Sequence, residues 1–270
     1  MNIPRVLAAL AVVAACPIAA LCQQPQPTGY HGVLCIKVNP GKDAEHSRWW
    51  DEEGRKLIRA MVDSGVVATY YRLRAVAPSG TLAPCDLVTV SVYPGLPPEP
   101  ATPEQREALL KKAGITNAEE FQARGNATRT VVSSEIFQNQ VALGTMKKGD
   151  YVAVSYMKTA HITDWLTMEK TIWQPLADAM IKEGVQSGWS VNLEIFPNGD
   201  DMPYQGVSVD VYPSLAAAIK GQNFDPRFDE WFKRVHPGLD ENSTLDNALK
   251  TRTQSKVYLF QIEDVVEAAK

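Results

Sequence analysis

The chain has 270 residues, of which 45% are hydrophobic and 21% are charged, and it carries a formal net charge of −4. This composition is typical of a globular protein with a sizeable core. It argues against a nucleic-acid-binding protein, since no cluster of lysine and arginine stands out. After residue 30, no apolar run approaches the roughly 20 residues that a membrane-spanning helix needs.

Residues 1–22 have the composition of a secretory signal peptide. A short positive start is followed by an apolar stretch, and the chain becomes polar at Gln23. Such a leader is removed on export, so we predict a secreted or periplasmic protein whose flexible segment 23–29 precedes the folded part. An alternative is a lipoprotein anchored through Cys16, although the apolar residues after Cys16 favour simple cleavage.

The chain contains an internal duplication. Residues 78–96 align without a gap with residues 197–215, and further matches continue backward at the same offset, as far as Leu57 and Leu176. So many matches in one register indicate a repeat. The period is too long for an array of small repeats, so each copy is expected to be a whole folding unit.

Each copy is expected to begin with a strand, at 33–38 and 151–157, because both segments are short, apolar and rich in β-branched residues. Apolar side chains then recur every three or four residues, which predicts an amphipathic helix in each copy. Asp43 and Thr163 are expected to cap these two helices.

A second strand is predicted at 67–77 and 187–196, and a third strand follows with alternating valines in each copy. The remaining expected elements are helices at 103–113, 118–124, 228–235 and 244–251, and final strands at 134–143 and 256–263. Each copy therefore has the order β-α-β-β-α-β, which is the ferredoxin-like pattern. We predict an α+β protein of two tandem ferredoxin-like units, residues 30–143 and 150–270, joined by a linker at 144–149.

This duplicated order, with paired third strands that both end in Tyr-Pro, resembles the dimeric α/β-barrel superfamily. The resemblance implies a pseudo-symmetric arrangement of two facing sheets within one chain, with a cavity between sheets and helices. The superfamily includes cofactor-free monooxygenases, isomerases, haem enzymes and binding proteins. The fold by itself therefore does not select a function.

The mature chain would retain two cysteines, Cys35 and Cys85. In the expected topology the first and third strands are parallel neighbours, which brings the two cysteines close enough for a disulfide. Two buried free thiols are the alternative. Val154 and Tyr204 stand at the equivalent places in the second copy, so a bridge would belong to the first copy alone.

Motifs for metal binding and catalysis are not found. The histidines are His31, His46, His161 and His236, and none forms a close ligand pair, so no metal site is predicted. Haem enzymes of this superfamily carry a helical axial histidine, which would make His236 a conceivable ligand, but a surface or capping role is favoured. We predict no cofactor and assign no catalytic residue; Glu169 is expected on a solvated helix face.

The two copies of the second strand differ in polarity, and this difference suggests a binding site. Tyr70, Arg72 and Arg74 lie where the other copy has Trp189 and further apolar residues. We predict that these four residues, with Asp210, face a cavity between the sheets and hold an anionic or carbonyl-bearing ligand. The alternative is an exposed edge strand whose charges discourage edge-to-edge pairing.

Four tryptophans, Trp49, Trp50, Trp165 and Trp173, could line a pocket for an aromatic ligand, although their helical spacing favours the core. The leading functional hypothesis is an exported protein that binds a small molecule between its sheets. One alternative is a cofactor-free monooxygenase or isomerase of the dimeric α/β-barrel type. Another is a structural or partner-binding module.

Overall fold

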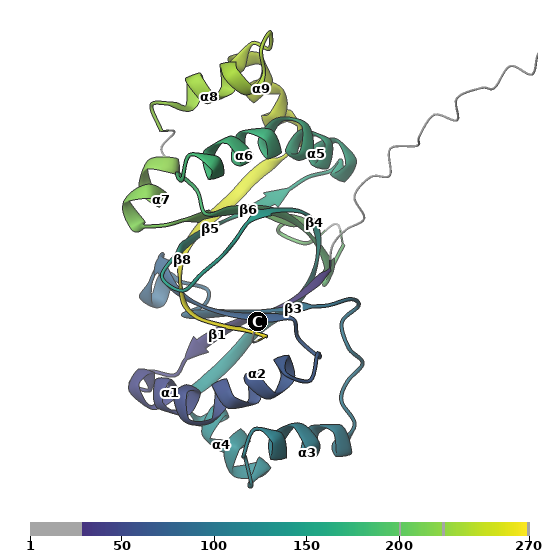
Figure 1. Ribbon diagram of the computed structural model, residues 1–270, viewed down its shortest axis with the longest axis vertical. Helices are drawn as coiled ribbons and strands as arrows, with labels where there is room; N and C mark the ends of the chain where they lie inside the picture. The colour runs from purple at the N-terminus through teal and green to yellow at the C-terminus, as the bar shows by residue number, and fades with distance from the viewer. Residues whose placement is uncertain (1–28, 200, 223–224, 269–270) are drawn as a thin grey trace, which may run out of the picture.

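The computed structural model describes residues 29–199, 201–222 and 225–268, and its centre is a closed barrel of eight strands with helices on two opposite sides (Figure 1). Around the barrel the strand order is β1-β3-β2-β8-β5-β7-β6-β4. The strands are β1 (Tyr30–Val38), β2 (Thr69–Ala77), β3 (Leu87–Tyr93), β4 (Arg129–Gly144), β5 (Tyr151–Lys158), β6 (Gly188–Phe196), β7 (Gly206–Tyr212) and β8 (Thr253–Glu267). The expected signal peptide lies outside the described residues.

The helices divide into two groups, one on each side of the barrel (Figure 1). The first group is α1 (Asp43–Trp49), η1 (Trp50–Gly54), α2 (Arg55–Val62), α3 (Pro103–Lys112) and α4 (Ala118–Thr128), and a short turn η2 (Gly80–Leu82) follows β2. The second group is α5 (Ile162–Met168), η3 (Glu169–Trp173), α6 (Gln174–Lys182), α7 (Leu215–Gln222), α8 (Phe228–Val235) and α9 (Glu241–Thr251). Among the described residues, no helix combines the length and apolarity needed to cross a membrane.

The two halves share the order of a strand, a long helix, two strands, further helices and a last strand, with one π-helical segment inside the long helix of each half. In the described residues η2 belongs to the first half alone and α7 to the second half alone. The sequence did not indicate the π-helical segments or α7. The caps also differ from the prediction. Asp43 is the first residue of α1, after Lys42, and Thr163 lies inside α5, whose N-cap is His161. Asp43 in a first helical turn still interacts favourably with the helix dipole.

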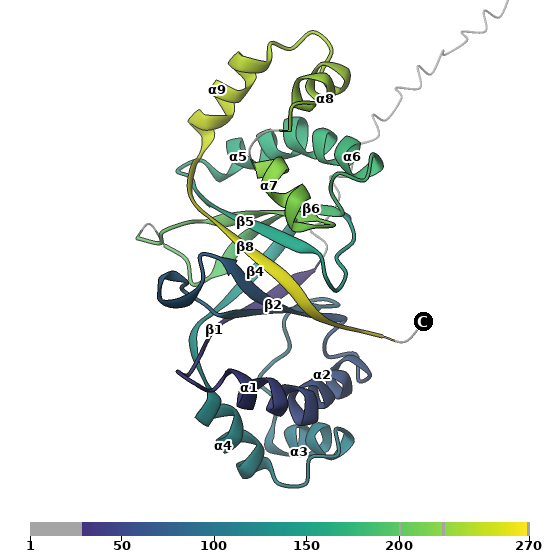
Figure 2. The ribbon, with the colours of Figure 1, turned by 90° about the vertical axis from the view of Figure 1, so that its left-hand side faces the viewer.

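The last strand of each half is long and reaches into the other half. β4 pairs first with β1 and then with β6, and β8 pairs first with β5 and then with β2. Figure 2 shows β8, in yellow, running from the upper helical layer to the lower one. Because β8 covers it, β2 is not the exposed edge strand of our alternative prediction: both of its sides are paired.

One face of the strands packs on helices, and the opposite face points into the barrel. Trp49 and Trp50 pack with Tyr70 on the helical side of the first half, and Trp165 with Trp189 on that of the second. A separate apolar cluster lies on the inner face; its buried members are Leu73, Val152, Val211, Phe260 and Ile262. The core thus has three layers, helix, barrel interior and helix, because apolar clusters lie on both faces of the barrel wall.

Cys35 and Cys85 form a disulfide, with 5.2 Å between their Cα atoms. Our prediction of neighbouring first and third strands agrees with the pairing of β1 with β3, but the predicted parallel direction was wrong. The helix between β1 and β2 carries the chain back, so β2 runs in the same direction as β1. The turn after β2 then reverses the chain. β3 is therefore antiparallel to both neighbours.

The strand pairing also corrects the residue that is equivalent to Cys35 in the second half. Tyr156 holds that place, not Val154, because the first strands of the two halves are offset by two residues more than the third strands. Tyr204 is equivalent to Cys85, and the rings of Tyr156 and Tyr204 lie 4.6 Å apart. An aromatic contact therefore stands in the second half where the first half has a disulfide.

The barrel interior also holds a buried carboxyl group, that of Glu194 in β6. Only 8% of the residue is exposed, and neither carboxylate oxygen has a hydrogen-bond partner among the described residues. Burial raises the pKa of Glu194 to about 8, and the charge of Glu135 acts in the same direction. Glu135 itself accepts a hydrogen bond of 2.9 Å from Tyr204.

We expect Glu194→Gln to stabilise the protein at alkaline pH. An acid whose pKa is raised by folding destabilises the native state progressively as pH rises from its unfolded value, 4.5, to its folded value, about 8. Below pH 4.5 the variant and the wild type should have similar free energies of unfolding. Above pH 8 the free energy of unfolding of the variant should be higher by about 1 to 3 kcal/mol. Urea unfolding across this range measures the difference. A difference in the free energy of unfolding that stays constant across this pH range would contradict the raised pKa of Glu194.

Candidate functional site

The five predicted ligand-binding residues lie on two opposite sides of the barrel. Tyr70, Arg72 and Arg74 face the helices of the first half, and not an inter-sheet cavity as we predicted. Tyr70 stacks on Trp50 with 5.6 Å between ring centroids, and the Arg72 guanidinium lies 5.2 Å from the centroid of the Trp50 ring. The inner face of β2 is formed instead by the alternate residues, among them Leu73.

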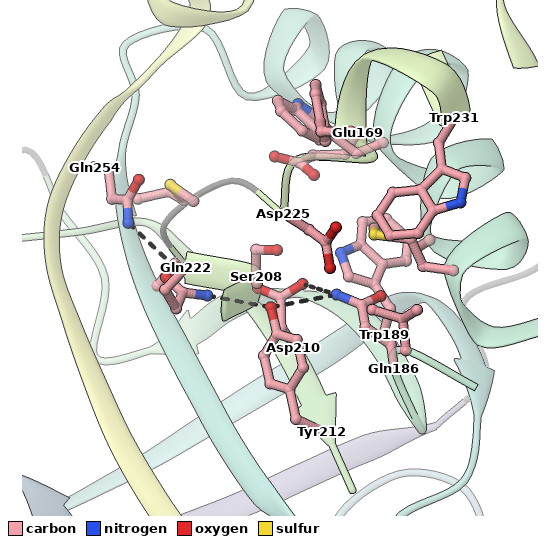
Figure 3. A pocket seen from close by; sticks show the side chains of 18 of the residues that line it. Glu169, Gln186, Trp189, Ser208, Asp210, Tyr212, Gln222, Asp225, Trp231 and Gln254 are labelled. Atoms are coloured by element: carbon pink, nitrogen blue, oxygen red, sulfur yellow. Dashed lines mark hydrogen bonds between the residues drawn. The ribbon is translucent and has the colours of Figure 1, made fainter. Parts of the chain in front are cut away.

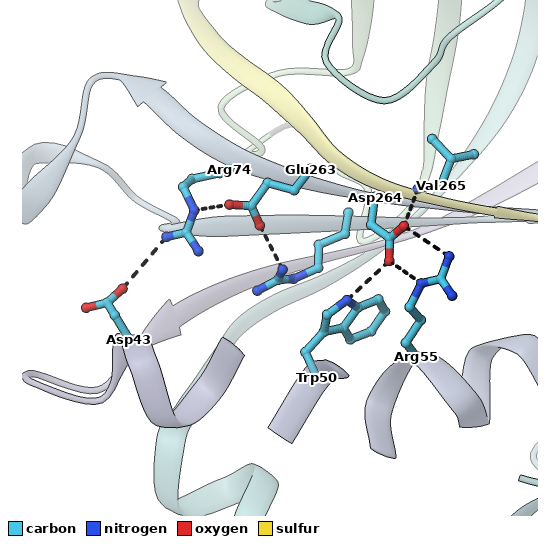
Figure 4. A network of polar contacts seen from close by, with 8 residues as sticks. Asp43, Trp50, Arg55, Arg74, Glu263, Asp264 and Val265 are labelled. Carbon is cyan, nitrogen blue, oxygen red and sulfur yellow. Dashed lines mark hydrogen bonds and ion pairs between the residues drawn. The ribbon is translucent and has the colours of Figure 1, made fainter. Parts of the chain in front are cut away.

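The two arginines of β2 are engaged by β8 (Figure 4). Arg72 forms an ion pair of 2.8 Å with Glu263, and Arg74 pairs with the same carboxylate. The next residue of β8, Asp264, pairs with Arg55 at 2.8 Å and accepts a hydrogen bond of 3.3 Å from Trp50 Nε1. These contacts hold the crossing strand β8 on the first half, which gives the two arginines a structural role.

Trp189 and Asp210 line a cavity of about 200 Å³ in the second half, between the barrel wall and the helical layer (Figure 3). The strands β5, β6 and β7 form its floor, and η3, α6 and α8 cover it. Apolar walls come from Trp173, Trp189, Trp231 and Phe228. The polar residues in its lining are Ser155, Glu169, Gln186, Ser208, Asp210, Tyr212, Gln222, Asp225, Arg252 and Gln254.

Asp210 lies at the floor of this cavity on β7. Gln186 Nε2 donates a hydrogen bond of 3.0 Å to its Oδ1, and Gln222 forms a second side-chain hydrogen bond with it. Burial raises the pKa of Asp210 to about 6, and these hydrogen bonds oppose the shift only in part. Near neutral pH this carboxyl group can therefore both take up and release a proton.

Glu169 is the first residue of η3 and only 1% exposed, so our prediction of a solvated helix face was wrong. Trp165 Nε1 donates a hydrogen bond of 2.7 Å to its Oε1, and Arg252 Nε lies 3.4 Å from the same atom. Burial raises the pKa of Glu169 to about 7, against the opposing effects of Arg252 and Trp165. The sequence carried a signal: Glu169 follows Trp165 by four residues, on the buried stripe of the helix.

Three polar atoms of the lining are buried without a hydrogen bond in the part of the chain that the structure describes. One of them, Arg252 Nε, has the carboxylate of Glu169 as its ion-pair partner. The other two have no such partner: they are Nε1 of Trp173, a donor, and Oε1 of Gln186, an acceptor. A buried polar group without a partner is costly. A ligand with one acceptor and one donor would satisfy both atoms.

The first half does not repeat this arrangement of residues. At the repeat offset Trp50 takes the place of Glu169, Ser91 that of Asp210, and Val67 that of Gln186. Trp50 and Val67 belong to the buried cluster that packs on Tyr70. The second half therefore has an acidic and an amide group, Glu169 and Gln186, where the first half packs the apolar side chains of Trp50 and Val67.

His236 does not fit the role of a haem ligand. Its Nε2 lies 3.0 Å from the carbonyl oxygen of Ile172, and it does not line the cavity. The cavity is also smaller than the roughly 300 Å³ at which pockets for drug-sized ligands begin. The described residues contain no cluster of histidine, cysteine and acidic side chains that could hold a metal ion.

Comparison with known proteins identifies the fold. No protein-family model matches the chain. No curated protein matches it either. A structure from Fusobacterium nucleatum, described as that of a candidate monooxygenase, aligns at a TM-score of 0.53 and 8% identity, covering 90% of this chain and 96% of that chain. A candidate monooxygenase from Lactobacillus acidophilus aligns at 0.51 and 10%, covering 89% and 96%.

At these identities the likeness shows the fold alone. The chain has the fold of the dimeric α/β-barrel proteins, and both halves of its barrel come from one chain. A candidate chlorite dismutase also aligns, at a TM-score of 0.46 and 14% identity over 87% of this chain and 94% of that chain, which is too distant to carry an argument.

Proposed function

We propose that the second-half cavity binds a small, planar organic molecule that carries both a hydrogen-bond donor and an acceptor. The observation that carries this proposal is the pair of buried, unpartnered atoms, Trp173 Nε1 and Gln186 Oε1, in the lining of one cavity. The tryptophan rings of the walls favour a flat ligand, and a volume of about 200 Å³ limits it to the size of a small aromatic compound.

A cofactor-free monooxygenase or isomerase is the second candidate, and one observation favours it. Glu169 and Asp210 have pKa values of about 7 and about 6, which suit a group that takes up and releases a proton near neutral pH. In such an enzyme Asp210, hydrogen-bonded by Gln186, would accept a proton from the bound molecule, and Arg252 would hold the charge of Glu169. The fold of the two candidate monooxygenases is compatible with this chemistry but does not establish it.

The division of the chain and its location are also part of the proposal. The duplicated element order supports two tandem ferredoxin-like units, residues 30–143 and 150–270, whose long last strands pair within their own unit and extend onto the other unit to close the barrel. The composition of residues 1–22 supports export, and a disulfide such as Cys35–Cys85 is stable in an oxidising compartment.

The test of the binding site is a titration of the purified protein with indole, phenol, catechol and benzamide, followed by calorimetry. We expect at least one of these compounds to bind, and Trp173→Phe to weaken it about tenfold, because the variant keeps the aromatic wall and removes the donor. Asp210→Asn should also change the affinity, since it alters the hydrogen bonds of Gln186.

Asp63→Asn is the matched control, because Asp63 is exposed at the end of α2 and lies outside the lining. This variant should bind like the wild type. Failure of all four compounds to bind, or equal affinities of Trp173→Phe and the wild type for a compound that binds, would overturn the proposed site. Turnover of a bound compound would decide in favour of the enzyme.

A further inference from the structure

The first half has a cavity of its own, in a different place from that of the second half. It lies between α2, α3 and α4, and its volume is about 490 Å³, within the range of roughly 300–1,000 Å³ that is typical of ligand pockets. Its walls are mostly apolar and include Trp49, Leu57, Met61, Leu110 and Phe121. The lower helical layer of Figure 1 shows the three helices that enclose it.

Two arginines, Arg106 and Arg129, are the charged residues in the lining of this cavity, and none of its described lining residues is acidic. Arg106 is exposed and lies on α3. Arg129 is half-buried at the start of β4, and its guanidinium lies 4.4 Å from the centroid of the Trp49 ring. Burial lowers the pKa of Arg129, and the charge of Arg72 acts in the same direction.

Comparison with the second half explains why Arg129 lacks an acidic partner. Arg252, directly before β8, is the equivalent of Arg129 in the second half. Its guanidinium lies over Trp173, and it forms an ion pair of 3.4 Å with Glu169. The repeat places Trp50 where Glu169 stands, so the first half has kept the arginine but not the acid. Among the described residues, no carboxylate forms an ion pair with Arg129.

We infer that this cavity is a second ligand site, and that it takes an amphipathic organic anion such as a medium-chain carboxylate. The carboxylate would pair with Arg129, whose planar guanidinium is suited to a bidentate contact. The apolar chain would lie against Leu57, Met61 and Phe121. Arg106, at the exposed rim, would attract the anion. Because salt screens this attraction, the affinity for the anion should fall as ionic strength rises. This site is independent of the cavity that contains Asp210.

Calorimetric titration of the full-length protein with decanoate, decan-1-ol and decyltrimethylammonium tests the inference. We expect decanoate to bind at least tenfold more tightly than the other two, because only its charge complements the cavity. Arg129→Gln should weaken decanoate binding about tenfold or more and leave decan-1-ol unaffected. Arg129→Lys keeps the positive charge but loses the planar guanidinium and its bidentate contact, so it should give an intermediate affinity.

Two further variants make the result specific to this cavity. Arg48→Gln removes the same charge from an exposed position on α1 that does not line the cavity, so it should bind decanoate like the wild type. Ala118→Trp fills the cavity from its exposed rim and should abolish binding without disturbing the core.

Equal binding of decanoate and decan-1-ol, or an Arg129→Gln variant with wild-type affinity, would overturn the inference. So would the absence of decanoate binding to the wild type. If Arg129→Gln fails to fold, the Arg129→Lys and Ala118→Trp variants decide the question. None of these results bears on the small aromatic compounds, whose binding depends on Trp173 in the other half.

Discussion

The substitution Glu263→Gln should lower the free energy of unfolding by about 3 to 5 kcal/mol, the range typical when one partner of a buried ion pair is removed. Glu263 pairs with Arg72, whose side chain is only 7% exposed, and with Arg74 (Figure 4). Without the carboxylate, the Arg72 charge would remain buried and uncompensated. Urea unfolding of the wild type and the variant measures the loss.

An exposed ion pair provides the control for this prediction. Asp178 and Lys182 form an ion pair of 2.6 Å on α6 with both side chains largely in solvent, so Asp178→Asn should cost about 1 kcal/mol or less. A second variant tests the cause. Arg72→Val together with Glu263→Val should recover most of the stability, since the second half carries Val191 at the position of Arg72. A Glu263→Gln protein as stable as Asp178→Asn would show that β8 is held by other contacts.

The double substitution Cys35→Ala and Cys85→Ala should lower the free energy of unfolding by about 2 to 4 kcal/mol. The disulfide closes a loop with a sequence separation of 50 residues, which contains the helix of the first half and β2. A cross-link of this length restricts the unfolded chain, and its removal favours unfolding. The second half, where Tyr156 and Tyr204 contact each other instead, is not affected directly.

Reduction of the wild type supplies the control for the disulfide. A reducing agent should bring the wild type to about the stability of the double variant and leave the double variant unchanged. Mass mapping of the mature protein under non-reducing conditions should recover the peptides of Cys35 and Cys85 joined. Two alkylatable thiols in the untreated protein, or a stability that does not respond to reduction, would exclude the bridge.

The candidate sites could be predicted only in part, because the sequence indicates which strand residues share a face but not what that face contacts. Arg72 and Arg74 share one face of β2, as expected, but that face packs on helices and on Glu263 of a strand about 190 residues away in the chain. Trp189 and Asp210 do share a cavity. Another buried acid of its lining, Glu169, was missed because a lone acid on an amphipathic helix is more often exposed.

Local patterns were enough for the order of the strands and the long helices, but not for α7 or the π-helical segments. Periodicities of two and about 3.6 residues, with proline and glycine at the turns, are properties of short segments, and the repeat supported the helix, the turn and the third strand of each copy. These patterns predicted the strands, the long helices and the neighbouring positions of the first and third strands.

Only the folded chain decides which strand face lies inside the barrel and where a cavity remains. Apolar side chains pack on both faces of these strands, so apolar periodicity does not distinguish the helical side from the interior. The long strands β4 and β8 pair across the two halves and close the barrel, and this closure determines which face of each strand points inward. Glu169 and Arg129 acquire their roles through contacts between segments far apart in the sequence, and such contacts leave no periodic pattern.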